Sequence, residues 1–140
     1  MEKITILLLD FCHFLWWAVS KKKKDSYDLV IIRTDAIGDF VLWSSALEEI
    51  LRHNINKKIL LIGNDQWTSL AAILFPQVSV MGVNYKKLNS ISNRYEELVK
   101  IVSIDAQELY YPVYSRAYTT GDSLALLIQA KTKIAFDGDL

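Results

Sequence analysis

Two carboxylates, Asp35 and Asp39, lie in a short polar turn that follows an apolar run at residues 29–33 and precedes a helical pattern. Gly38 is the only glycine in this turn. A carboxylate at such a position can act as a general base that takes the proton from a hydroxyl group attacking an activated substrate. Because open α/β sheets bind their ligands at the carboxyl ends of the strands, this turn is the strongest candidate for a catalytic site in the chain.

Each residue of the turn also has an ordinary structural explanation. Asp39 stands where the helix begins, and an acid there is stabilised by the free N–H groups and the helix dipole, by about 0.5–2 kcal/mol. Asp35 is more simply a turn residue that bonds its own backbone, although repulsion from Asp39 would raise one of the two pKa values. The turn needs Gly38 either for a positive φ or for the close approach of a ligand. Arg33, at the strand end, either balances the acids or binds a ligand.

A second group of polar residues, Ser115 and Arg116, follows the apolar run at 109–113. If that run is a strand of the same parallel sheet, both side chains lie at the same edge as Asp39. An arginine there can hold a carboxylate or phosphate of an acceptor through two parallel hydrogen bonds. The structural alternative is an ion pair with Asp122. Weaker candidates for contacts with sugar hydroxyl groups are Asn64, Asp65 and Tyr114.

Strand and helix patterns alternate along the rest of the chain. Strands are predicted at 29–33, 58–62, 78–83, 109–113 and 133–136. Helices are predicted at 40–52, 67–74, 93–102 and 122–130. Strands that alternate with helices of this length form a parallel sheet with right-handed crossovers and helices on both faces. The sequence therefore predicts an α/β, Rossmann-like domain over residues 25–140.

Residues 4–19 are almost continuously apolar and are followed by four lysines at 21–24. The run predicts a hydrophobic helix, shorter than the roughly 20 residues needed to cross a bilayer. A narrow polar stripe favours a helix that lies in the membrane interface, with the lysines on anionic headgroups. We therefore expect residues 1–24 to project from the body as a peripheral membrane contact. The polar stripe consists of Asp10, His13, Trp17, Lys21 and Lys24, and the residues expected to stay uncovered are Leu8, Leu9, Phe11, Leu15 and Trp16.

Two other interpretations of the N-terminal segment stay open. The helix can instead pack on this domain or on another one. It can also be a cleaved signal peptide, because Ala18-Val19-Ser20 has small residues at the spacing of a cleavage site. A lysine run directly after the cleavage site argues against that second alternative.

Charge balance and the rarity of metal-ligating residues exclude several function classes. The 16 basic and 16 acidic residues give a formal net charge of +0, which argues against nucleic acid as the main partner. One cysteine, Cys12, cannot form an internal disulfide, and the two histidines lack ligand spacing, so no metal site is predicted. No Gly-Lys-Ser/Thr follows the turn, which argues against a phosphate-binding loop of that kind.

The strand–turn–helix segment with Gly38-Asp39 resembles the opening of the glycosyltransferase family 9 enzymes, the heptosyltransferase-like group. A second match is the segment Tyr111-Pro112-Val113-Tyr114-Ser115-Arg116, which is followed by Asp122 and a helical pattern. The resemblance implies the N-terminal, acceptor-side domain of a two-domain GT-B glycosyltransferase that works with inversion. It implies Asp39 as the catalytic base, and we expect Gly38, Asp35, Ser115 and Arg116 to bind the acceptor.

The resemblance further implies a nucleotide-sugar donor, typically ADP-heptose, bound mainly by a second domain, with no other cofactor. The acceptor would be lipopolysaccharide or another cell-surface glycan or lipid-linked glycan, and the location cytoplasmic at the inner membrane. The chain ends at Leu140, where the first domain of that family ends, so the donor domain is expected to come from elsewhere. The alternatives are a truncated, non-catalytic remnant or binding module of the same fold, and a stand-alone flavodoxin-like module with an acidic ligand or metal pocket.

Overall fold

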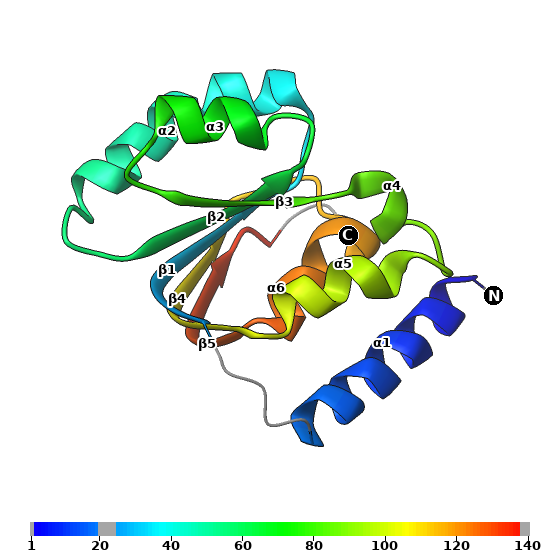
Figure 1. Ribbon diagram of the computed structural model, residues 1–140. Coiled ribbons are helices and arrows are strands. Elements are labelled where there is room, and N and C mark those ends of the chain that lie inside the picture. Colours follow the sequence, from blue (N-terminus) through cyan, green and yellow to red (C-terminus); the bar gives the residue numbers. More distant parts are fainter. Residues whose placement is uncertain (1, 20–24, 138–140) are drawn as a thin grey trace.

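A computed structural model describes residues 2–19 and 25–137, so the lysine run at 21–24 lies outside the described residues. The chain forms one five-stranded sheet in the order β3-β2-β1-β4-β5, in which every neighbouring pair is parallel (Figure 1). The predicted α/β class with a parallel sheet is confirmed. The strands are β1 (Asp25–Arg33), β2 (Ile59–Asn64), β3 (Ser79–Val83), β4 (Ile104–Tyr111) and β5 (Gln129–Ala135).

Helices cover both faces of this sheet, as Figure 1 shows. One face carries α2 (Ile37–Arg52) and α3 (Thr68–Leu74), and the other carries the remaining elements that connect the strands. These are α4 (Tyr85–Leu88), α5 (Arg94–Ile101), the π-helical turn η1 (Tyr118–Asp122) and α6 (Ser123–Leu127).

The central strand explains why two cores form. In β1, Leu29 and Ile31 belong to the core under α2 and α3, whereas Val30 and Ile32 belong to the core under α5 and α6. Successive side chains of a strand point to opposite faces, so an unbroken apolar run is buried on both. All four side chains are fully buried.

The N-terminal helix α1 (Glu2–Val19) lies beside α5 and α6 instead of projecting from the body (Figure 1). It contacts the body through buried Ile6 and through Asp10, which forms a buried ion pair with Arg94. The expected projection is therefore wrong, because Asp10 finds its partner in the body. The expectation of uncovered side chains holds for Leu8, Leu9, Phe11 and Leu15, while the side chain of Trp16 lies outside the described residues. Within the described ranges, every helix is too short or too polar to span a bilayer.

Several boundaries differ from the sequence predictions. Strand β4 begins at Ile104, five residues before the predicted start. The prediction missed its first half because Asp105, Gln107 and Glu108 interrupt the apolar pattern there. The last predicted helix, 122–130, ends at Leu127, and the chain continues as an exposed edge strand. The strand predicted at 133–136 is β5, which begins four residues earlier, at Gln129. Lysines are common on edge strands because they block further pairing, and Lys131 and Lys133 interrupt the apolar pattern here.

Candidate functional site

The five predicted site residues come from the two chain segments that follow β1 and β4, and Gly38 and Asp39 already belong to α2. From β1 the chain winds outward over one face to β2 and β3, then returns over the other face to β4 and β5. The connections after β1 and β4 therefore leave toward opposite faces, and a crevice at the carboxyl ends of two such strands is where open α/β sheets bind ligands. Arg33 Nη1 joins these two ends directly, because it donates to the carbonyl oxygen of Pro112 at 2.6 Å. The run at 109–113 thus overlaps β4, a parallel neighbour of β1 in the same sheet, and the ends of these two strands lie side by side.

Asp35 is held in place by Arg33 and by the indole of Trp67. Arg33 Nε donates to Asp35 Oδ1 at 3.1 Å, and Arg33 Nη2 lies 2.6 Å from Asp35 Oδ2. Trp67 Nε1 donates to the backbone oxygen of Asp35 at 2.9 Å. The Trp67 ring stacks on Phe40 of α2, with centroids 4.1 Å apart, and covers Gly63 of β2. Asp35 is thus a fixed part of the turn, and Arg33 balances it as predicted.

The pKa of Asp35 is raised from its ordinary value. Burial is the largest cause, and it outweighs the neighbouring positive charge of Arg33. The negative charge of Asp39 adds to the rise in the pKa of Asp35 to a lesser extent. Repulsion between the two acids is therefore present, as the sequence predicted, but desolvation has the larger effect.

Asp39 lies in the first turn of α2, on the solvent side. The N-cap position belongs to Ala36, and no side chain caps the helix. Among the residues that the structure describes, none forms a hydrogen bond or ion pair with the Asp39 carboxylate. Asp39 is therefore not the N-cap, and the structural alternative that holds is an acid in the first turn that interacts with the helix dipole.

Gly38 is the second residue of α2, and its φ lies outside the left-handed region. A Cβ built at this position meets no atom within 4 Å. The expectation that the turn needs a positive φ here is wrong. Neither backbone geometry nor packing therefore requires a glycine at position 38. The space beside the first turn of α2 is open.

Ser115 and Arg116 follow β4 at the same edge of the sheet. Ser115 is exposed. Arg116 Nε donates to Asp122 Oδ1 at 2.9 Å, and Arg116 Nη1 donates to the carbonyl oxygen of Phe136 at 3.1 Å. The structural alternative for Arg116, a pair with Asp122, is therefore what the structure shows. Burial, followed by the charge of Asp122, raises the pKa of nearby Tyr111 to about 12, so its phenol stays protonated.

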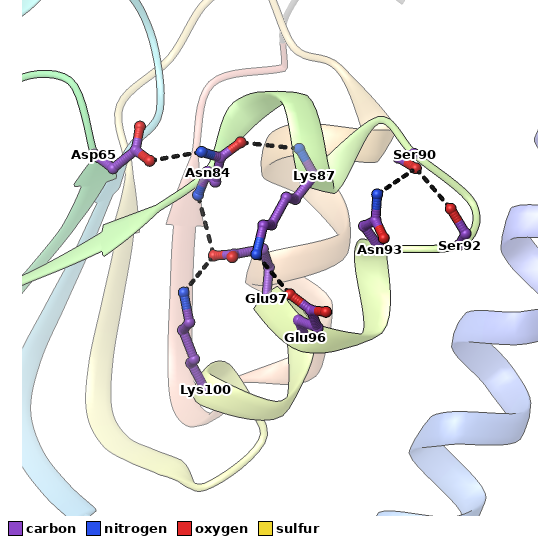
Figure 2. A network of polar contacts seen from close by, with 9 residues as sticks. All are labelled: Asp65, Asn84, Lys87, Ser90, Ser92, Asn93, Glu96, Glu97 and Lys100. Atoms are coloured by element: carbon purple, nitrogen blue, oxygen red, sulfur yellow. Dashed lines mark hydrogen bonds and ion pairs between the residues drawn. The ribbon is translucent and has the colours of Figure 1, made fainter.

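The weaker candidates after β2 belong to a polar network that holds the edge of the sheet together (Figure 2). Asp65 Oδ2 accepts from Asn84 Nδ2 at 2.7 Å, and Asn84 Oδ1 accepts from the backbone N–H of Lys87 at 3.0 Å, which caps α4. The backbone N–H of Asn84 donates at 3.0 Å to Glu97, a buried acid that also pairs with Lys100. Asn64 is buried and bonds the turn at Gln66, whereas Tyr114 is exposed.

A second polar cluster, absent from the sequence predictions, is centred on Arg94 at the start of α5. Its Nε and Nη2 donate to Asp10 at 2.9 and 3.0 Å, and Nη2 also donates to Ser123 Oγ at 2.5 Å. Its Nη1 donates to the carbonyl oxygens of Leu88 and Thr119. All five guanidinium N–H groups therefore have an acceptor. The available signal in the sequence was Asp10 itself, because a lone acid in an apolar helix needs a partner.

In the described part of the chain, no three His, Cys, Asp or Glu side chains gather so that they could hold a metal ion. No protein-family model, no curated protein and no solved structure matches this chain. The function must therefore be inferred from the geometry at the carboxyl ends of β1 and β4. We call this place the switch point, because the connections after the two strands leave toward opposite faces of the sheet.

Proposed function

We propose that this chain is the acceptor-side domain of an inverting glycosyltransferase of the kind it resembles, with Asp39 as the general base. The transferred sugar would be heptose-like, and the acceptor lipopolysaccharide or another cell-surface glycan. The observation that carries the proposal is the state of the acids at the switch point. Asp35 and Asp122 are held by Arg33 and Arg116, whereas the Asp39 carboxylate is exposed and has no partner among the described residues.

A general base must be able to receive a proton where the substrate lies. Protonation of Asp35 would weaken the pair with Arg33 that shapes the turn, so Asp35 is better suited to positioning. Protonation of Asp39 breaks no contact among the described residues. The open space at Gly38 lies next to Asp39 and lets an acceptor approach the backbone of the first turn.

The proposed reaction needs one carboxylate and no covalent intermediate. The acceptor hydroxyl gives its proton to Asp39 while its oxygen forms a bond to the anomeric carbon of the donor sugar. The bond from that carbon to the nucleoside diphosphate breaks at the same time, and the leaving group takes the electron pair. Attack from the side opposite the leaving group inverts the anomeric configuration.

We assign the acceptor to Gly38, Asp35, Ser115 and Arg116. The Ser115 hydroxyl is exposed and can bond a sugar hydroxyl. Arg116 is anchored by Asp122 and by the Phe136 carbonyl, so an anionic group of the acceptor would bind an arginine that is already oriented. The nucleotide sugar would be held mainly by a separate donor domain, and the proposal includes a cytoplasmic location at the inner membrane.

Binding and chemistry can be tested separately. The ¹⁵N-labelled chain is titrated with deacylated lipopolysaccharide core oligosaccharide, and amide shifts are expected at 35–39 and 115–116. Shifts confined to other parts of the molecule, or no shifts, would contradict the acceptor site. Transfer is measured with ADP-heptose and a separately expressed donor-binding domain, comparing Asp39→Asn with Glu48→Gln, an exposed acid further along the same helix.

We expect Asp39→Asn to keep oligosaccharide binding and lose transfer, while Glu48→Gln keeps both. Oligosaccharide binding without transfer in any combination would instead identify a binding module that lacks catalysis. Equal transfer rates in wild type and Asp39→Asn would show that Asp39 is not the base.

A further inference from the structure

We infer that α1 docks this protein on an anionic bilayer surface, through the helix face that points away from the body. The inference does not depend on the transferase proposal, because it concerns a different surface and its test needs neither donor nor acceptor.

The outward face of α1 is apolar along its length. Ile4, Leu8, Phe11 and Leu15 are all exposed, the most exposed of them Ile4 at 64%. They follow one another at steps of three and four residues, so they line one side of the helix. Ile6 and Asp10, both 6% exposed, lie on the opposite side, which faces the body. The apolar side of the helix is therefore free to enter the interface, as the sequence predicts, whereas Asp10 of the polar stripe faces the body.

The ion pair with Arg94 removes the obstacle that Asp10 presents to membrane binding. Asp10 is the one formally charged residue between positions 4 and 19, and a carboxylate is costly to bury in a bilayer. Here the Asp10 carboxylate accepts two hydrogen bonds from Arg94 and one from the Tyr118 hydroxyl at 3.2 Å. The charge is thus satisfied inside the protein, and none of the exposed α1 side chains that the structure describes is charged.

The apolar surface continues from α1 onto the body. A groove of about 300 Å³ runs between α1 and the η1–α6 segment, and Leu7, Phe11, Leu126 and Leu127 line it together with the polar cluster. Leu126 is itself exposed. Contiguous apolar surface of this kind is uncommon on a monomeric soluble protein and marks a contact with a partner or a membrane.

The charge next to this surface favours a bilayer over a second copy of the chain. Four lysines at 21–24 follow α1 directly in the sequence. Each lysine near an anionic leaflet strengthens binding by about fivefold. A second copy of the chain carries the same four lysines and so offers this run no complementary negative charge. Because α1 is not long and apolar enough to cross a membrane, it would lie in the plane of the interface.

The experiment measures sedimentation of the full chain with vesicles of phosphatidylcholine alone and of phosphatidylcholine mixed with phosphatidylglycerol. We expect binding to the mixed vesicles that weakens with added salt. The double variant Leu8→Glu/Leu15→Glu should bind at least about tenfold more weakly, because it places charge in the face that enters the interface. Its matched control is Leu42→Glu/Ile73→Glu, which makes the same change of charge at exposed positions of α2 and α3.

Loss of binding in the first variant and retained binding in the control supports the inference. If both variants lose vesicle binding equally, the change in net charge alone explains the loss, and the inference is wrong. If wild type ignores both vesicles but forms a dimer that Leu8→Glu/Leu15→Glu abolishes, the occupant of this face is a second copy, and the inference is also wrong. Since all four positions are exposed, none of the variants should unfold the chain.

Cys12 provides an independent readout of which face meets the bilayer, because it is exposed and is the chain's one cysteine. An environment-sensitive fluorophore on Cys12 should shift to shorter emission wavelength on phosphatidylglycerol vesicles and be quenched by nitroxide-labelled lipid. Vesicle binding without any change in this emission would place the contact elsewhere and overturn the inference.

Discussion

The switch-point turn and the N-terminal helix are each held by an arginine–aspartate pair, but the two pairs leave different groups free. Arg33 and Asp35 are two residues apart, partly exposed, and lie beside Asp39, whose carboxylate has no partner among the described residues. Asp10 and Arg94 are 84 residues apart, and their side chains are 7% and 4% exposed. Every N–H group of Arg94 is used.

The comparison separates a site that can do chemistry from one that holds two segments together. A proton acceptor must be accessible and lose nothing essential when it is protonated, which describes Asp39 and not Asp10. A buried, fully satisfied pair instead costs desolvation energy that its hydrogen bonds offset, and removing one member leaves a buried charge. We therefore treat the first region as the functional candidate and the second as the device that fixes α1.

The largest effect is expected at Asp39. With a donor domain present, Asp39→Asn should lower the rate of transfer by about 10²–10⁴-fold, the usual contribution of a general base. Stability should change by less than about 0.5 kcal/mol, because the side chain is exposed and has no partner among the described residues. Transfer rate and melting temperature measured on the same preparation check both statements. The comparison variant Asp35→Asn should lose far less transfer, and equal losses would erase the distinction between the two acids.

Removal of Asp10 should have the next largest effect, this time on stability. Asp10→Ala leaves the buried guanidinium of Arg94 without its carboxylate, which should reduce the free energy of unfolding by about 3–5 kcal/mol. Urea denaturation followed by circular dichroism measures the change. The double variant Asp10→Ala/Arg94→Met should be less destabilised than the single one, since no buried charge remains. Wild-type stability in Asp10→Ala would show that α1 is not held by this pair.

The two pairs also show what the sequence could reveal. The alternation of apolar and polar segments predicts the parallel sheet, and Arg33 beside Asp35 could be predicted because the two are neighbours in the chain. A period of 3.6 residues predicts an apolar face on the helix at 40–52, and the prediction is confirmed in part. Phe40, Leu47 and Leu51 are buried, Trp43 and Ile50 are half-buried, and Leu42 and Ala46 are exposed. Arg94 could not be assigned, because no local pattern links it to a partner 84 positions away.

Short or mixed elements were also beyond the sequence pattern. Helix α4 has four residues, too few to show a periodicity, and its stability comes from the Asn84 cap and the network in Figure 2. At the candidate site, the sequence placed Asp39 and Arg116 at one edge of the sheet but could not decide between their alternatives. For Arg116 the structure shows the ion-pair alternative, because its side chain bonds Asp122, six residues later in η1.

Glycine substitutions should have an intermediate effect and distinguish packing from ligand access. In Gly63→Ala the new Cβ would lie 2.1 Å from the Trp67 ring, which positions the backbone of Asp35. Such overpacking should cost about 1–3 kcal/mol, measured by urea denaturation. The control Gly38→Ala meets open space and should keep wild-type stability. The same control should weaken oligosaccharide binding if a ligand approaches this backbone, and unchanged binding would contradict that role of Gly38.

The smallest effect is the pH dependence that Asp35 gives to stability. Burial raises its pKa above the ordinary value of 3.8 despite the pair with Arg33, so the folded chain binds this proton more tightly than the unfolded chain. Folding is then favoured by protonation. The contribution of Asp35 is fully present below its unfolded pKa and declines as pH rises through the folded one. Urea denaturation of wild type and Asp35→Asn across this acidic range should show the stability of wild type falling relative to the variant, then running parallel to it at neutral pH. If the stability of wild type instead rises relative to the variant as pH increases, the attraction of Arg33 for the Asp35 carboxylate exceeds the cost of its desolvation. The Arg33–Asp35 pair would then resemble the Asp10–Arg94 pair more than we infer.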